Sequence, residues 1–286
     1  NALLVAGVKP AHATEVAPSM YSVRSSFIEV YGKSIRDQLL VTRRNLNIDG
    51  LNALDLRTLK PNGEPWDFTK RADRKEARTM IDEQDPDWIL GAPPCTSFSI
   101  WNYAMNYAKM DADVVRAKLA EGRLHLNFVC SLYRRQVARG KYFLHEHPAT
   151  ALSWKEDAIT ALERNPFTQV VTCDQCRYGL VTPSAEDSSV MLPAMKPAKF
   201  MTNSTSMASQ LSLRCKKDHV HQQLVGGRCK DASFYPPALV RAILNGISLQ
   251  AKADQLDIDA QEETRSYVNA MPMSTAPIAK VNFDEP

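Results

Sequence analysis

Short apolar runs alternate with longer segments of helical pattern between residues 25 and 250. The short runs are bounded by glycine, aspartate or proline and stand at 25–32, 51–56, 87–92, 141–148 and 168–176. Continuous apolar runs of this length are typical of strands that are buried on both faces of a sheet. We therefore predict five strands in the interior of one domain.

Two longer segments predict helices. In residues 111–140 apolar side chains recur at helical spacing, acids stand at the start, and Arg139 and Gly140 stand at the end. Residues 235–250 begin with prolines, which a helix tolerates in its first turn, and continue with an apolar helical pattern. Strands that alternate with helices predict an α/β fold with an open, mostly parallel sheet and helices on both faces.

The two ends of the chain differ from this middle part. Residues 1–24 and 255–286 show no sustained hydrophobic period, and the second of these segments is polar and contains prolines. We interpret them as a flexible leader and a flexible tail around a domain that spans residues 25–254. Because the chain begins with Asn1 rather than methionine, we also expect it to be a segment of a longer polypeptide.

The composition is that of an ordinary globular protein, with 44% hydrophobic and 23% charged residues. The net charge of +3 permits a nucleic-acid partner without requiring one, because 32 acidic residues offset 35 basic residues. No apolar run approaches the ~20 residues that a membrane helix needs, so we expect no membrane partner. The six cysteines are scattered and follow no secretory signal, which indicates free, metal-binding or catalytic thiols in an intracellular, reducing compartment.

The stretch GAPPCTSFS places a cysteine directly after two prolines at the end of the third predicted strand. Pro93 and Pro94 restrict the backbone, so the Cys95 thiol stands on a stiff loop. A thiolate is the strongest side-chain nucleophile near neutral pH, which makes Cys95 a candidate catalytic residue. The alternative is a small buried hydrophobic side chain, which is the usual role of a free cysteine.

A carboxylic acid, Glu146, stands at the end of the next predicted strand. Because the carboxyl ends of neighbouring parallel strands open into one cleft, we expect Glu146 and Cys95 to face the same ligand. The alternatives for Glu146 are a solvated loop acid or a partner for His145 or His147. Either histidine could instead serve as the base of a cysteine hydrolase.

Pro93-Pro94-Cys95 with Phe98-Ser99, followed about fifty residues later by Glu146, resembles the cytosine carbon-5 DNA methyltransferases. More narrowly, PWDFTK, PPCTSFS, EHPATALSW, TNS and YPPALVRAI are similar to methyltransferase-like segments of retroelement polyproteins of protists. The resemblance implies a class I, Rossmann-like methyltransferase fold with a short recognition insertion at residues 203–230. It also implies DNA as the partner, or RNA as an alternative, and a nuclear location in a eukaryote.

The resemblance further implies S-adenosylmethionine-dependent methylation of cytosine carbon 5. Cys95 would add to carbon 6 of the ring, and Glu146 would hold the ring nitrogen. The implied cofactor contacts are Glu29, Gly32, Asp55, Asp67 and Pro93. The implied substrate contacts are Ser99, Lys196, Lys199 and Arg214.

The chain departs from the family pattern at three motifs. The Gln-x-Arg-x-Arg element that supports the catalytic loop is absent, and Lys196 and Lys199 stand roughly in its place. The cofactor loop holds the single glycine Gly32 where the family has two, and the glutamate motif is Glu-His-Pro rather than Glu-Asn-Val. A catalytically inactive methyltransferase fold that binds nucleic acid is therefore the main alternative function. A zinc nucleobase deaminase is excluded by motif order, because here Pro-Cys precedes the glutamate.

Sulfur and imidazole side chains form a second candidate site. Two halves about forty residues apart supply the ligands that a tetrahedral structural Zn²⁺ prefers, namely Cys176, Cys215, His219 and His221. Such an ion would staple the short recognition region, which has little core of its own. The alternative is a set of unrelated thiols and two exposed histidines, because the spacing is not that of a standard zinc finger.

Overall fold

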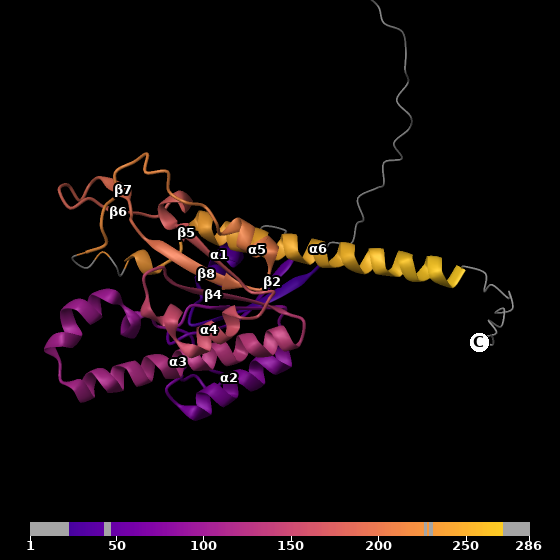
Figure 1. Cartoon of the computed structure of the whole chain (residues 1–286), viewed down its shortest axis with the longest axis horizontal. Coiled ribbons are helices and arrows are strands. Elements are labelled where there is room, and N and C mark those ends of the chain that lie inside the picture. The colour runs from indigo at the N-terminus through magenta and orange to yellow at the C-terminus, as the bar shows by residue number, and fades with distance from the viewer. Residues whose placement is uncertain (1–22, 43–46, 226–227, 229–230, 271–286) are drawn as a thin grey trace, which may run out of the picture.

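The computed structural model describes residues 23–42, 47–225, 228 and 231–270. Nearly all of the predicted leader, the last part of the predicted tail and Cys229 lie outside these residues. Within them, a twisted sheet lies between two layers of helices (Figure 1). The predicted α/β architecture is therefore confirmed, and the sheet is compatible with a Rossmann-like fold.

The central sheet has six strands in the order β2-β1-β3-β4-β8-β5. The strands β1 to β4 are parallel, whereas β8 runs antiparallel to both β4 and β5. Their bounds are β1 Ser25–Val30, β2 Ile48–Leu54, β3 Trp88–Gly91, β4 Tyr142–Pro148, β5 Gln169–Asp174 and β8 Pro197–Thr202. All five predicted strands are present, and β8 is a sixth strand that the apolar pattern did not predict.

Side chains alternate between the two faces of the sheet and build two separate cores. From β3, Ile89 enters the core that α2, α3 and α4 cover, and Leu90 enters the core that α1, α5 and α6 cover. Helices therefore cover both faces of the sheet (Figure 1). The helix bounds are α1 Ser34–Thr42, α2 Arg71–Gln84, α3 Ala112–Ala138, α4 Asp157–Glu163, α5 Thr205–Gln210 and α6 Pro237–Ala270.

The predicted boundary at residue 254 needs correction, because α6 continues to Ala270. Its first turns bury Ile243 and Ile247, whereas Leu256 is 68% exposed where the helix extends away from the body (Figure 1). Residues 251–270 contain no proline or glycine and are rich in alanine, glutamate and glutamine, which favour a helix without packing. The first part of the predicted tail is therefore helical.

Residues 203–230, the predicted recognition region, are divided between the main core and the edge of the sheet. Helix α5 belongs to the core, since Met207 is fully buried against α6. The material outside the sheet is an edge lobe made of residues 175–196 and 211–225. It includes the hairpin of β6 Val181–Pro183 and β7 Met191–Pro193 and lies beside β5 (Figure 1). Among the described helices, none is both long and apolar enough to cross a bilayer.

Candidate functional site

The carboxyl ends of β1, β3 and β4 lie at one edge of the sheet. Val30 is in register with Gly91, and Gly91 is in register with His145. Cys95 follows Gly91 by four residues, and Glu146 follows His145 directly. Both residues therefore stand near the carboxyl ends of these parallel strands. The chain order also reverses between β1 and β3, which is where open α/β sheets bind ligands.

The Cys95 loop is held as a tight turn. Cys95 precedes the 3-10 turn Thr96–Phe98, whose Phe98 amide donates to the Cys95 carbonyl at 3.0 Å. The Tyr107 hydroxyl donates to the Ser97 carbonyl at 3.0 Å. Phe98 is buried, whereas Cys95 is half-buried. The turn therefore anchors its aromatic side chain in the core and leaves the thiol at the edge of the sheet.

Helix α3 approaches this turn closely at Gly122. A Cβ atom at Gly122 would lie 2.7 Å from the Ser97 Cβ and 3.2 Å from the Phe98 ring. The Ser97 hydroxyl also donates to the Lys118 carbonyl of α3 at 3.0 Å. A glycine at this position lets the cysteine turn pack directly on the helix backbone.

Gly122→Ala is therefore expected to push the Cys95 turn away from α3. Overpacking of this kind costs about 1–3 kcal/mol, which should outweigh the gain of up to ~1 kcal/mol in helix propensity. Urea denaturation measures the net loss of stability, with Asn127→Ala on an exposed position of α3 as the control. Equal or higher stability of Gly122→Ala would contradict the close packing.

The end of β4 is tied to the cysteine loop through His147. The Nε2–H group of His147 donates to the Pro93 carbonyl at 2.9 Å, and its Nδ1 atom accepts from the Ser153 hydroxyl at 2.6 Å. Burial lowers the pKa of His147 from 6.5 to about 4, so the ring is neutral at physiological pH. Since the carbonyl can only accept, these two bonds fix the tautomer of the ring.

These contacts argue against the hydrolase interpretation. Both ring nitrogens of His147 are committed to Pro93 and Ser153. His145 is fully buried, bonds to the Tyr133 hydroxyl at 3.2 Å, and has its pKa held well below 6.5 by burial. Neither histidine is placed as a solvent-linked base, so His147 acts instead as a clamp on the loop that carries Cys95.

Glu146 points to the opposite side of β4 from the two histidines and is buried. Burial raises the pKa of the Glu146 carboxyl, the Lys196 charge opposes that rise, and the Tyr235 hydroxyl bonds to the carboxyl. Its Oε1 atom is buried and has no hydrogen-bond partner among the described residues. The solvated-acid and histidine-partner interpretations are therefore wrong, and one oxygen remains to bind a ligand.

Glu29 is a residue of β1, and its side chain lies at the amino end of α1. Its carboxylate accepts from the Ile35 amide at 3.2 Å and from the Arg36 amide at 2.7 Å. Burial raises the pKa of Glu29 to about 7. The amide groups at a helix start usually bind a phosphate or carboxylate of a ligand. Here the side chain of the protein fills that position and turns it acidic, so it suits a cationic group rather than a phosphate.

A pocket of about 200 Å³ lies between the end of β1 and the cysteine turn. Its wall includes Tyr31, Leu56, Phe68, Pro94, Gly122 and His125. The Tyr31 hydroxyl bonds to the Nδ1 atom of His125 at 2.9 Å, and the Tyr31 ring meets Phe68 edge-on at 5.0 Å. The walls are mostly apolar, and their polar groups are the Tyr31–His125 pair and the side chains of Thr96, Ser97 and Glu121.

Two predicted cofactor acids stand next to this pocket. Asp55 precedes the lining residue Leu56, is buried, and accepts from the Arg57 side chain at 2.6 Å. Asp67 precedes the lining residue Phe68, and the hydrogen bond from the Thr69 hydroxyl lowers the pKa of its carboxyl. Asp55 and Asp67 thus each stand one residue before a lining residue, and their cofactor role stays a prediction, whereas Tyr31 and His125 had no motif to reveal them.

The four predicted substrate contacts separate into two groups. Ser99 is half-buried at the end of the cysteine turn, and Lys196 acts on Glu146. Lys199 is on β8, with its amine 5.6 Å from the centre of the Trp154 ring. Arg214 lies on the edge lobe and donates to Asp174 at 2.8 Å. Of the four, only Ser99, in the turn that follows Cys95, and Lys196, whose charge acts on Glu146, are therefore linked to the two predicted catalytic residues.

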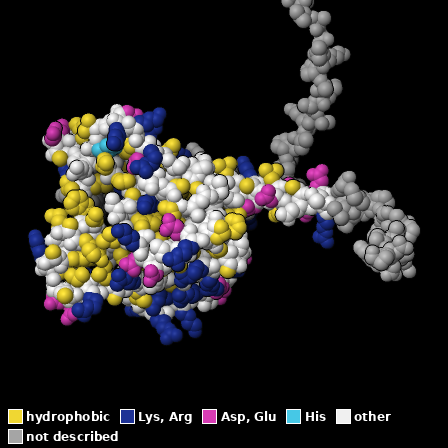
Figure 2. Space-filling model, in the orientation of Figure 1, with side chains coloured by type: hydrophobic (Ala, Val, Ile, Leu, Met, Phe, Trp, Pro, Cys, Tyr) yellow, Lys and Arg dark blue, Asp and Glu magenta, His cyan; other side chains and the backbone are white. Residues whose placement is uncertain are grey.

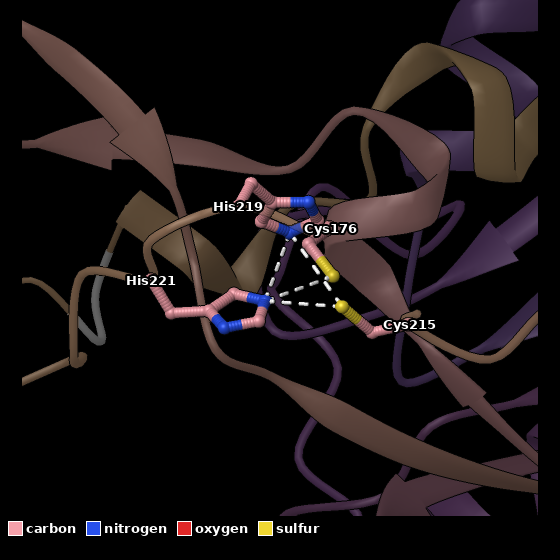
Figure 3. A group of neighbouring side chains, drawn as sticks. All are labelled: Cys176, Cys215, His219 and His221. Atoms are coloured by element: carbon pink, nitrogen blue, oxygen red, sulfur yellow. Dashed lines mark hydrogen bonds between the residues drawn. The ribbon is translucent and has the colours of Figure 1, made fainter. Parts of the chain in front are cut away.

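The four predicted metal ligands come together in the edge lobe (Figure 3). Their sulfur and nitrogen atoms all lie within 4.8 Å of one another. The Cys215 sulfur is 3.6 Å from His219 Nε2 and 3.5 Å from His221 Nε2, and the Cys176 sulfur is 3.4 Å from His221 Nε2. Four side chains are thus arranged so that they could hold a metal ion. Cys173 stands three residues before Cys176 in the motif Cys-Asp-Gln-Cys, and it is buried in the core instead.

Local contacts orient this cluster. Cys176 lies in the 3-10 turn Gln175–Tyr178 that follows β5. The Asp174 carboxylate accepts from the Cys215 amide at 2.7 Å, which brings the second half of the cluster to that turn. His219 bonds through Nδ1 to the Asp218 carboxylate at 2.8 Å, so its Nε2 atom faces the other ligands. A carboxylate behind a histidine is a common feature of metal sites.

Comparison with known proteins assigns no family. No protein-family model matches the sequence, and no curated protein matches it. The functional assignment therefore rests on the residues and on the geometry described above.

Proposed function

We propose that this chain methylates carbon 5 of cytosine in DNA, with Cys95 as the nucleophile and Glu146 as the partner of the ring nitrogen. The observation that carries the proposal is the buried Glu146 oxygen without a partner, at the end of the strand whose next residue clamps the cysteine loop. An acid and a rigidly held thiol at adjacent strand ends are what this reaction requires.

The chemistry follows from the electron demand of the ring. Carbon 5 of cytosine is a poor nucleophile until the Cys95 thiolate adds to carbon 6 and shifts the π electrons to carbon 5. The raised pKa of Glu146 favours its protonated form, which can donate to the ring nitrogen as charge develops there. Carbon 5 would then take the methyl group that the cofactor supplies. A base would remove the carbon-5 proton, and the Cys95 sulfur would leave as the double bond between carbons 5 and 6 forms again. The target base must leave the stack, which costs a few kcal/mol in a duplex.

The pocket between β1 and the cysteine turn is compatible with S-adenosylmethionine. Leu56, Phe68 and Pro94 provide apolar walls for a purine ring, and Asp55 stands beside them for ribose hydroxyls. Glu29 offers a carboxylate to a cationic group and leaves no helix start open for a phosphate. When bound, this cofactor supplies an electrophilic methyl group. The acidic pattern thus favours it over nicotinamide or nucleoside phosphate cofactors.

Two further features support the proposal. An antiparallel strand set between the last two parallel strands, as β8 is here, is the arrangement that the class I methyltransferase fold implies. Hydrophobic side chains gather on the left part of the face that Figure 2 shows. The segment after the Cys95 turn exposes large apolar side chains, including Trp101 at 67% and Tyr103. Exposed aromatic rings beside an active-site loop can stack on unpaired bases.

Covalent trapping tests the proposal. The protein is incubated with S-adenosylmethionine and single-stranded DNA that contains 5-fluorocytosine, and the products are separated under denaturing conditions. Because fluorine at carbon 5 cannot be removed as a proton is, the protein should stay bonded to the DNA. No adduct, in a preparation that binds S-adenosylmethionine, would contradict the proposed reaction.

A catalytically inactive nucleic-acid-binding module is the second candidate. The observation in its favour is the crowded cofactor loop, in which Tyr31 adopts a φ of 64° and a Cβ at Gly32 would lie 3.2 Å from Glu29. Such a module would bind DNA or RNA without binding S-adenosylmethionine. Isothermal titration with the cofactor separates the two candidates.

We also propose that the cluster of Cys176, Cys215, His219 and His221 binds a structural Zn²⁺. Tetrahedral coordination at about 2.3 Å to sulfur and about 2.0 Å to nitrogen separates sulfur and nitrogen ligands by roughly 3.5 Å. The three sulfur–nitrogen distances of 3.4 to 3.6 Å match this spacing. Two thiolates and two imidazoles complete the coordination shell, as is typical of a structural site.

The expected result for zinc is one ion per chain. Elemental analysis after gel filtration measures the stoichiometry, and replacement by Co²⁺ should give the intense visible absorption of a tetrahedral site with sulfur ligands. Cys215→Ser should reduce metal affinity by about 10–100-fold or more, because losing a ligand is at least as harmful as losing its outer partner. Cys173→Ala, which removes a buried thiol outside the cluster, should retain the ion.

A further inference from the structure

We propose that a metal ion at this cluster fixes the main chain of residues 193–196, because hydrogen bonds from both halves of the cluster hold that segment. The inference rests on the zinc binding proposed above, and it is independent of the methylation reaction. It assigns to the ion a positioning role for Lys196 opposite Glu146.

The first connection runs from Cys176. The residue before it, Gln175, donates its amide to the Lys196 carbonyl at 3.1 Å. Gln175 is fully buried, so this bond is shielded from water. Anchoring the Cys176 sulfur on an ion therefore holds the backbone of Lys196 from one side.

The second connection runs from His221. The residue after it, Gln222, accepts from the Met195 amide at 3.1 Å and donates to the Pro193 carbonyl at 2.8 Å. These two bonds form a short ladder in which Ala194 pairs with Gln222. Anchoring the His221 imidazole therefore holds the same backbone from the other side, one residue before Lys196.

Lys196 links this backbone to Glu146. Its amine donates to the Ala232 carbonyl at 2.7 Å. Its charge acts on the buried Glu146 carboxyl, whose free oxygen is the proposed ligand contact. Movement of the 193–196 segment would therefore change both the charge and the shape beside Glu146.

The edge lobe has only a small core of its own. Its separate buried apolar cluster contains Leu180 and Ala194, together with Ala232, among the described residues, whereas Tyr178 and Leu211 pack into the core that α6 covers. Val181, Met191 and Met195 are exposed on the same lobe. Because so small a core contributes little stability, a bound ion can supply most of the folding free energy of the lobe.

Hydrogen exchange tests the inference on the whole chain in three states: loaded with zinc, stripped with a chelator, and reloaded. We expect the amides of Gln175, Met195 and Gln222 to lose at least ~10-fold of their protection without zinc and to regain it on reloading. The amides of β1 and β3, which pair only within the central sheet, should keep theirs. Cys215→Ser should behave as the stripped protein does, and Cys173→Ala should behave as the loaded protein does.

The outcomes separate the two proposals. If the loaded sample contains no zinc by elemental analysis, both the metal assignment and the positioning of residues 193–196 by the ion are overturned. If zinc is bound but the three amides keep their protection on stripping, the metal assignment stands and the positioning of residues 193–196 by the ion is overturned. Trapping of 5-fluorocytosine DNA enters neither comparison, so failure of the methylation proposal leaves this test intact.

Discussion

Cys95→Ser should eliminate the covalent adduct with 5-fluorocytosine DNA completely. A serine hydroxyl has the same shape as the thiol but is far less acidic, so it supplies no anion near neutral pH. The half-buried side chain makes no large packing contribution, and unfolding stability should stay within about 0.5 kcal/mol of the original protein. Denaturing gels measure the adduct, and urea denaturation measures the stability.

The matched control is Cys130→Ala. Cys130 lies in the core beneath α3, and burial raises the pKa of its thiol to about 12, so it cannot supply a thiolate. This variant should still form the adduct, whereas Glu146→Gln should form it about 10²–10⁴-fold more slowly through loss of an acid. An adduct that persists in Cys95→Ser would assign the nucleophile to another residue and contradict the proposed reaction.

The sheet illustrates what a local pattern can predict. The strands β1, β3 and β4 each contain a short apolar run that is buried on both faces of the sheet, and these runs predicted the strands. Strand β8 does not, because its run is short, begins with Pro197 and is interrupted by Lys199, whose amine lies over the Trp154 ring. Its antiparallel place between β4 and β5 depends on pairing with residues far away in the sequence, which no local period records.

The candidate site also contains residues that the sequence predicted and residues that depend on tertiary contacts. Cys95 and Glu146 could be placed because parallel topology fixes where strand ends meet, and the four metal ligands because few side chains bind zinc. The clamp from His147 to the Pro93 carbonyl could not be predicted, since it depends on which face of β4 each side chain takes and on the nearby Ser153 hydroxyl. The pocket pair of Tyr31 and His125 joins two elements whose contact is tertiary.

The clamp also has a consequence for acid stability. His147 titrates at about 4 in the folded chain and at 6.5 in its ordinary state, so the unfolded chain binds more protons between these values. Its contribution to stability is complete above pH 6.5 and is lost as the pH falls toward 4. A shift of this size corresponds to about 3 kcal/mol. Glu29, whose pKa is raised to about 7, slopes in the opposite sense across the same range.

A difference between two variants therefore isolates the histidine. In His147→Gln the amide can still donate to the Pro93 carbonyl but no longer takes up a proton. Glu29 contributes equally to both proteins, and burial, the main cause of the lowered pKa of His145, remains in both, so these slopes largely cancel. The stability of His147→Gln relative to the original protein should rise by about 3 kcal/mol between pH 7 and pH 4, as measured by urea denaturation. Asn127→Ala, on the exposed side of α3, should show a constant difference. A constant difference for His147→Gln as well would mean that the ring titrates normally, and the loop carrying Cys95 would then lack a neutral clamp.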